Sequence, residues 1–251
     1  MTDQRGLFLY GIVPSDVEPT PDAVGVGDPP GEVIAVQHGE LAVLASEVGL
    51  EEPIGRPADL TAYQTLLDGT AEVAPVLPVR FGTVVTGEDA VADLLDAHHD
   101  QFAAALDEFE DRIQYTVHGR FDEQELISRL LAENPAAADL AEQVRGRPEA
   151  ESREQRIRLG EMISQAVELS REAENRQLVE AAGRFAVRDA ARPPSHELDA
   201  VNVAFLVAVD DEDEFVGAVE EFAEQRRGLV RMRLLGPLAP YDFVSAHQLV
   251  D

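Results

Sequence analysis

The order of strand-like and helix-like segments constrains this chain more than any other feature of its sequence. Residues 7–117 alternate short apolar runs, typical of strands, with amphipathic helical stretches. Residues 121–192 show only helical patterns and many charges, and residues 193–251 return to alternation. Because strands and helices that alternate in blocks pack as layers, this order predicts an α+β fold.

The N-terminal region, residues 1–120, is expected to form one α+β domain. Strands are expected at 7–13, 33–37, 41–45, 76–85 and 113–117. Helices are expected to begin at Asp59 and Thr86, since apolar residues recur at helical spacing after each. The expected arrangement is a sandwich with the helices on one face of an antiparallel or mixed sheet.

The C-terminal region, residues 121–251, is expected to form a second α+β domain with long charged helices. Its first segment, 121–192, contains a long, highly charged stretch that predicts one helix or a helix pair with a narrow apolar stripe. Its second segment, 193–251, reads as strand, helix and strand, followed by a turn at Gly236-Pro237.

The net charge of the chain is strongly negative, and its basic side chains are all of one type. The chain has 251 residues, with 49 acidic against 20 basic side chains, and its net charge is −29. No lysine occurs, so every basic residue is arginine, and cysteine is absent as well. These absences exclude P-loop and Schiff-base lysines, thiolate nucleophiles, iron–sulfur clusters and cysteine-bound zinc.

No catalytic, cofactor or metal constellation stands out in the remaining residues. The Gly25 to Pro30 segment, GVGDPP, begins like a dinucleotide fingerprint but has proline where glycine is needed. His98 and His99 are adjacent on a helical stretch, so their side chains diverge by about 100°. No serine lies in a GxSxG elbow. We therefore expect no enzyme, no cofactor and no metal.

The sequence also predicts where the protein works. The N-terminus has no secretion signal and no apolar run reaches the roughly 20 residues that span a bilayer. We expect a cytoplasmic protein without membrane insertion, and without a nucleic-acid partner because its negative surface repels polyanions. Acid excess with complete loss of lysine predicts a concentrated-salt environment, with an acidic protein from a GC-rich genome as the alternative.

Two segments carry more unusual residues than core packing needs. They are LPVRFGTVV, residues 77–85, and GPLAPYDFV, residues 236–244. Prolines interrupt or stiffen both segments, and each delivers aromatic side chains. Each is equally consistent with a structural corner and with a partner-binding surface. The candidate residues are Pro78, Arg80, Phe81, Gly82, Pro240, Tyr241 and Phe243.

These two segments resemble signatures of the gas vesicle protein F/L family. LYGIV at residues 9–13 and NVAFLV at residues 202–207 resemble further segments of that family, in the same order. The sequence departs from the pattern at Tyr63-Gln64 and near Leu238, which leaves the F-like and L-like branches undistinguished. Together with the acid excess, the resemblance indicates a haloarchaeal-type member.

The resemblance implies a non-enzymatic accessory protein of gas vesicle assembly, the process that provides buoyancy. It implies an N-terminal modified ferredoxin-like domain and a C-terminal α+β domain. It also implies protein–protein contacts with the gas vesicle shell protein and with other accessory proteins, in the cytoplasm and on the vesicle. The alternative function is a ligand-sensing regulatory module, because ferredoxin-like domains often bind small molecules.

The charge yields a first testable prediction. Like charges repel less when salt screens them, and the Debye length is only about 3 Å at 1 M salt. We expect the far-UV circular dichroism of a helical fold to diminish as NaCl is diluted below about 1 M. An unchanged spectrum at low salt would contradict the expected adaptation to hypersaline conditions.

Overall fold

The computed structural model describes residues 5–50 and 54–244, which divide into two compact units. The first unit comprises residues 1–115 and 236–251, and the second comprises residues 116–235. The division expected at 120/121 therefore lies at 115/116, and the C-terminal segment returns to the first unit. The physical reason is a set of hydrogen bonds that this segment forms with residues 68 and 114.

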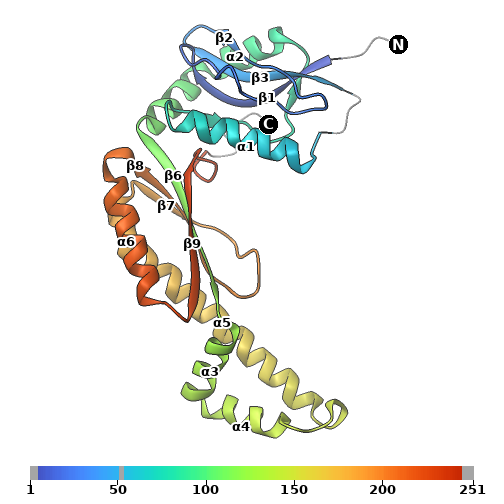
Figure 1. Ribbon diagram of the computed structural model, residues 1–251, viewed down its shortest axis with the longest axis vertical. Helices are drawn as coiled ribbons and strands as arrows, with labels where there is room; N and C mark the ends of the chain where they lie inside the picture. Colours follow the sequence, from blue (N-terminus) through green and yellow to red (C-terminus); the bar gives the residue numbers. More distant parts are fainter. Residues whose placement is uncertain (1–4, 51–53, 245–251) are drawn as a thin grey trace. The chain divides into compact units, whose positions relative to one another are not determined.

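The first unit is built on an antiparallel sheet (Figure 1). Its strands are β1 (Arg5–Pro14), β2 (Val33–His38), β3 (Leu41–Gly49), β4 (Leu77–Pro78) and β5 (Val84–Val85). The order is β2-β3-β1-β4, and β5 also pairs with β1. The expected hairpin is confirmed as β2 and β3. The single strand expected at 76–85, with an edge position or a bulge at Pro78, is wrong, because the chain turns away between β4 and β5 with Gly82 at a φ of 91°.

Helices α1 (Pro57–Ala71) and α2 (Glu88–Phe109) cover this sheet. Residues 6–13 of β1 are all buried, which requires cover on both faces. Tyr63 and Leu67 of α1 pack with Phe8 and Tyr10 on one face, and α2 lies on the other (Figure 1). The expectation that both helices share one face is therefore wrong. A sheet this apolar on both sides needs two layers of helix.

The second unit contains a four-stranded sheet of order β7-β8-β6-β9. Its strands are β6 (Arg112–Phe121), β7 (Arg188–Ala191), β8 (Asp199–Ala208) and β9 (Val230–Leu238). The strand expected at 113–117 extends into this sheet instead of joining the first one. The turn expected at Gly236-Pro237 is wrong, since β9 continues through both residues.

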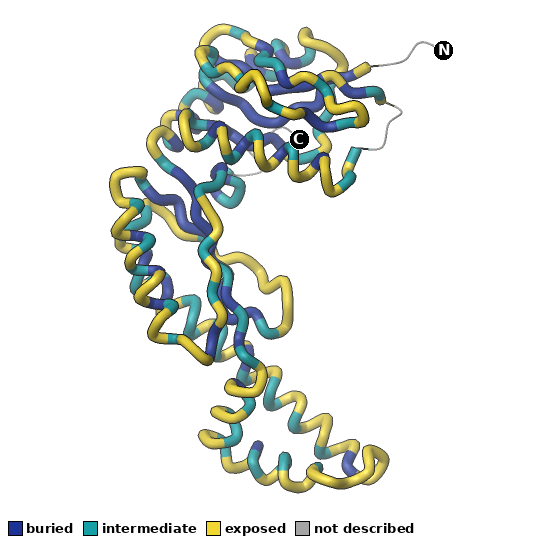
Figure 2. Tube along the Cα trace, in the orientation of Figure 1, coloured by how far each residue is buried: buried dark blue, intermediate teal, exposed yellow. Residues whose placement is uncertain are grey.

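The helices of the second unit are α3 (Glu123–Glu133), α4 (Pro135–Val144), α5 (Arg153–Ala182) and α6 (Glu212–Gln225). The short 3₁₀ helices of this unit are η1 (Glu149–Glu151), η2 (Gly183–Phe185) and η3 (Val209–Asp211). The charged stretch is one helix, α5, with a narrow buried stripe at Val167, Leu178 and Ala182. Most of its remaining surface is exposed (Figure 2).

Helix α1 starts one turn earlier than expected, and Asp59 has a different role. The N-cap is Arg56, so Asp59 lies at the third helical position and is 2% exposed. Its carboxylate accepts hydrogen bonds from the backbone N–H groups of Gly27, Gly55 and Arg56 at 2.9–3.1 Å. The Arg56 guanidinium also donates to it, at 3.0 Å, and holds the pKa of Asp59 far below its usual range. Asp59 thereby joins two loops to the start of α1.

This buried carboxylate gives a stability prediction. Asp59→Ala leaves several buried N–H groups without an acceptor and should lower the free energy of unfolding by about 2 kcal/mol at pH 7. Because the folded-state pKa is depressed, the contribution of Asp59 is present above about pH 4 and fades as the pH falls further. Urea unfolding at pH 7 and at pH 3.5 measures both effects.

The matched control is Asp28→Ala, which removes an exposed carboxylate that contacts the same Arg56 guanidinium at 2.8 Å. Exposed ion pairs contribute little, so this variant should unfold like the wild type. Equal losses in the two variants would contradict the role of Asp59.

Candidate functional site

Tyr63 of α1 lies at the centre of an aromatic cluster. Its ring centroid is 5.3 Å from that of Phe81 and 6.4 Å from those of Phe8 and Tyr241. The Tyr63 hydroxyl donates a hydrogen bond to the Val79 carbonyl at 2.5 Å. Burial raises the pKa of Tyr63, which keeps this hydroxyl a donor. Tyr63 therefore brings together the two segments that the sequence singles out.

Asp68, one turn further along α1, holds the C-terminal segment. Its Oδ1 accepts hydrogen bonds from the Ala239 backbone N–H at 2.9 Å and from the Tyr241 hydroxyl at 3.0 Å. Burial raises the pKa of Asp68, and burial together with the Asp68 charge raises that of Tyr241. A second pair of bonds joins the side chain of Gln114 to Asp242, at 2.6 and 3.0 Å. These contacts seat residues 239–243 in the first unit.

The candidate residues differ in how far they are buried. Five of them are wholly or partly buried, namely Pro78, Phe81, Pro240, Tyr241 and Phe243. Only Arg80 and Gly82 are exposed, in the turn between β4 and β5. The buried residues shape the core around α1, and partner binding by any of the candidates stays a prediction. The sequence identified these segments but missed Asp68, because one carboxylate among 49 carries no distinguishing signal.

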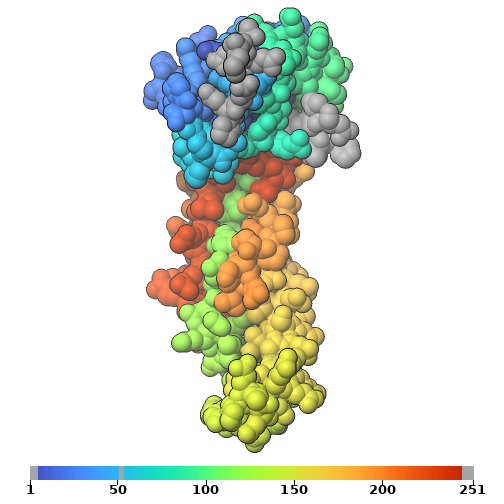
Figure 3. Space-filling model, turned by 90° about the vertical axis from the view of Figure 1, so that its right-hand side faces the viewer, coloured from blue at the N-terminus to red at the C-terminus, as the bar shows by residue number. Residues whose placement is uncertain are grey.

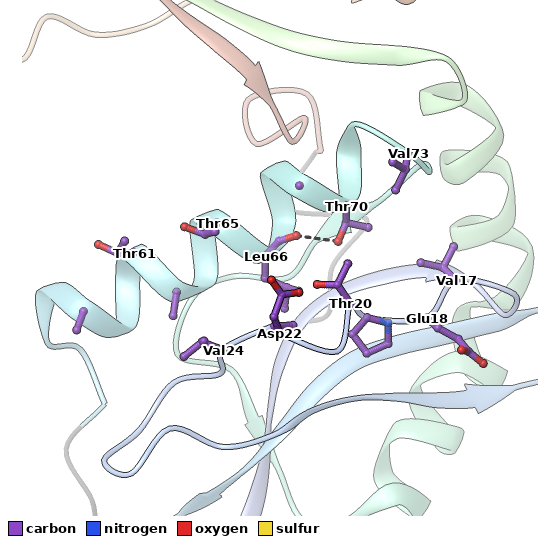
Figure 4. Close-up of a pocket in the computed structure, with 15 residues that line it drawn as sticks. Val17, Glu18, Thr20, Asp22, Val24, Thr61, Thr65, Leu66, Thr70 and Val73 are labelled. Atoms are coloured by element: carbon purple, nitrogen blue, oxygen red, sulfur yellow. Dashed lines mark hydrogen bonds between the residues drawn. The ribbon is translucent and has the colours of Figure 1, made fainter.

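Sequence reasoning also missed a groove on the outer side of α1 (Figure 4). It has a volume of about 590 Å³ and lies between α1 and the loop of residues 17–24. The helix contributes Ala58, Thr61, Ala62, Thr65, Leu66, Gly69 and Thr70, the turn after it contributes Val73, and the loop contributes Val17, Glu18, Pro19, Thr20, Asp22, Ala23 and Val24. The helical residues recur at intervals of three and four, so they form one face.

The groove is mainly apolar with an acidic edge. Val24 and Val73 are 57% and 82% exposed, which is unusual for large apolar side chains. The Asp22 side chain points toward α1 near Leu66 (Figure 4), and Glu18 lies further along the same loop. This combination suits an apolar ligand or protein segment that carries a positive charge.

Small side chains explain why the sequence did not reveal this groove. Alanine, threonine and glycine dominate the helical face, whereas searches for amphipathic helices rely on large apolar residues. Gly69 is the residue whose position in the sequence best indicates the groove. It lies inside α1, it is exposed, and a Cβ there would meet nothing within 4 Å. Since glycine in a helix costs about 1 kcal/mol relative to alanine, its position facing the groove is informative.

Metal-binding clusters and membrane-spanning helices are absent among the described residues. Within residues 5–50 and 54–244, no group of three His, Asp or Glu side chains is placed to hold a metal ion. Among the helices that the structure describes, none is long and apolar enough to cross a membrane.

The contact between Asp68 and the C-terminal segment predicts a graded response to substitution. Asp68→Asn keeps an acceptor oxygen and should be nearly neutral, whereas Asp68→Ala should lower the free energy of unfolding by about 2 kcal/mol. Because the folded-state pKa of Asp68 is raised, the wild type should gain stability relative to Asp68→Asn as the pH falls from 7 to 4.5. Chemical denaturation at both pH values tests this, and equal behaviour of the two variants would refute it.

Comparison with known families agrees with the sequence signatures. The family model described as "Gas vesicle synthesis protein GvpL/GvpF" matches residues 6–245. A protein named gas vesicle protein F from Streptomyces sp. (strain CB03234) is 33% identical over 239 residues, covering 95% of this chain and 99% of that one. Gas vesicle protein L from the same strain is 28% identical, and the match covers 98% of this chain and 95% of that protein.

Solved structures show the same fold. The crystal structure of the gas vesicle protein GvpF from Anabaena sp. PCC7120 superposes with a TM-score of 0.78 at 23% identity, over 96% of this chain and 98% of that one. The crystal structure of GvpF from Microcystis aeruginosa gives a TM-score of 0.75 at 23% identity, over 96% of this chain and 99% of that one. These relatives are bacterial, so the expected haloarchaeal type finds no support among them. On the family match along nearly its whole length, the chain belongs to the gas vesicle protein F and L family.

Proposed function

We propose that this protein is a non-enzymatic accessory factor of gas vesicle assembly that binds the shell protein or other accessory proteins during nucleation or growth. The observation that carries the proposal is the family match over residues 6–245. The protein acts in the cytoplasm and in association with the vesicle. The modified ferredoxin-like description of the first unit is part of this proposal; its antiparallel sheet supports the description, while its two helices lie on opposite faces of that sheet.

The α1 groove is the proposed contact site for a gas vesicle protein. Small residues such as Gly69, Ala62 and Thr65 allow the backbone of a partner to approach α1 closely. Exposed Val24 and Val73 supply apolar contact area at this surface. Tyr63 and Asp68 act one layer deeper, because Tyr63 bonds to Val79 and Asp68 bonds to Ala239 and Tyr241, and these contacts hold α1 against the core.

A ligand-sensing function is the second candidate. The groove volume of about 590 Å³ lies within the range of small-molecule sites, which supports this alternative. It predicts a metabolite that raises the melting temperature of the wild type, by mass action on the folded state. A thermal-shift screen in which no metabolite stabilises the protein would count against it.

Gly69→Leu provides a sharp test of the proposed function. A Cβ at position 69 meets nothing within 4 Å, Gly69 lines the groove, and leucine should stabilise α1 by about 0.8 kcal/mol relative to glycine. A strain lacking the gene should form no vesicles or deformed ones. The wild-type gene should restore normal vesicles in electron micrographs, and Gly69→Leu should fail to restore them although the protein is folded.

The matched control is Gly217→Leu in α6, where a Cβ also meets nothing within 4 Å. This variant should restore vesicles like the wild type. Normal vesicles in the deletion strain would refute the accessory role itself. Full rescue by Gly69→Leu would refute only the groove as the contact site.

A further inference from the structure

The α1 groove continues into a second hollow at the end of α1. This hollow has a volume of about 570 Å³, and three segments line it: the end of β1 with the loop after it, the residues that follow α1, and the end of α2. Val17, Glu18 and Val73 line both the groove and the hollow, so the two form one continuous surface of the first unit. In the space-filling view of Figure 3, α1 (cyan) lies at the surface beside blue residues that precede it.

The second hollow combines apolar walls with four carboxylates. Pro14, Pro75 and Leu106 contribute apolar wall, and Leu106 is only 4% exposed. The carboxylates come from the loop after β1 and from the end of α2, and they are those of Asp16, Glu18, Asp107 and Glu110. All four residues are exposed. We call this second hollow, with its four carboxylates, the acidic hollow.

Two helices end at the acidic hollow. Asp107 lies in the last turn of α2 and Glu110 is its C-cap, while Val73 and Pro75 follow the end of α1 at Ala71. The C-terminus of a helix carries partial negative charge, so carboxylates there are unfavourable and cations are favourable. Neither helix has a basic residue in its last turn. The helix ends and the carboxylates therefore add up to a strongly negative potential at this surface.

No cation of the described residues compensates this charge. Within residues 5–50 and 54–244, none of the four carboxylates forms an ion pair. Arg112, just after α2, donates to the Glu108 carbonyl at 2.7 Å and does not line the hollow.

Carboxylates near helix ends in the second unit are arranged differently. Glu142 of α4 pairs with Arg145 at 2.7 Å, and Glu224 of α6 pairs with Arg227. The chain thus places an arginine beside such carboxylates elsewhere and leaves those of the acidic hollow without one.

Surface hydration alone does not explain this site. In a chain with 49 acidic residues, exposed carboxylates are common and keep the surface hydrated. Here they surround Val73, which at 82% exposure is the most exposed large apolar side chain among the described residues. Apolar surface next to uncompensated charge of one sign is complementary to an amphipathic partner of the opposite sign.

We propose that the α1 groove and the acidic hollow together bind an amphipathic helix of a partner protein. Its apolar stripe lies along α1, where small residues such as Gly69 and Ala62 allow two helices to approach closely, and arginine or lysine residues at its end lie in the acidic hollow. Helix α1 has 15 residues, so a partner helix of about 15 residues spans the groove. This inference rests on the proposed function and states the chemistry of the partner at the same groove.

Fluorescence anisotropy with a labelled peptide tests the proposal. The probe is Ser-Ala-Leu-Gln-Ser-Leu-Leu-Ala-Gln-Leu-Ala-Arg-Leu-Arg-Arg, and its control peptide has glutamine at the three arginines. The assay uses the full-length protein at the lowest NaCl concentration at which circular dichroism shows the complete helical signal. We expect the wild type to bind the probe about tenfold more tightly than the control peptide, because each exposed ion pair adds a modest contribution.

The double variant D107N/E110Q should bind the probe about fivefold more weakly than the wild type and bind the control peptide equally well. It should not lower the melting temperature, since it removes carboxylates from the C-terminus of a helix. The matched control is D139N/E161Q, which removes two exposed carboxylates from α4 and α5 and changes the net charge equally. This control variant should bind the probe like the wild type, and Gly69→Leu should weaken the binding of both peptides.

The proposal is overturned if the wild type does not bind the probe, if it binds the two peptides equally, or if the two double variants weaken binding equally. Unchanged binding of the probe to Gly69→Leu also overturns it. The proposed function then still stands if Gly69→Leu fails to restore vesicles, because that result is obtained without the peptide. Full rescue by Gly69→Leu refutes the groove as a contact site and this inference with it.

Discussion

The first unit depends on two carboxylates that hold α1 from inside the protein. Asp59 joins the start of the helix to Gly27 and Gly55, and Asp68 joins its middle to Ala239 and Tyr241. Each accepts several donors in a buried setting, where an unsatisfied donor would be costly. The core cluster around Tyr63 and the groove on the outer side of α1 both require the helix to stay in this position. Most other carboxylates among the described residues are exposed.

The charge of the protein is therefore less uniform than its total implies. The value of −29 predicts a surface that repels anions, yet the buried Asp199 of the second unit lies 3.2 Å from Nε2 of His118 and 3.6 Å from Nε of Arg120. The groove of the first unit has an apolar floor and acidic residues on its loop.

Much of the fold was predictable from local pattern. The strand at 7–13, the hairpin after it, the amphipathic helix α2 and the strand–helix–strand order near the C-terminus are confirmed. The incorrect predictions concern segments whose secondary structure depends on pairing with strands distant in the sequence. Residues 76–85 have the composition of a strand, but only their two ends pair with β1. Gly236 was expected in a turn, but it lies in β9 against the ring of Tyr115, where a side chain would overlap.

By itself the sequence determined the α+β class, the family and the exclusion of lysine- and cysteine-based chemistry, because these depend on composition, local periodicity and motif order. Only the tertiary structure decided that the 77–85 and 236–244 segments meet at Tyr63, that Asp59 is buried and Asp68 partly buried, and that a groove lies beside α1. Such features arise when residues distant in the chain share one surface. A pattern of neighbours along the chain does not encode which of them will meet across a sheet or beside a helix.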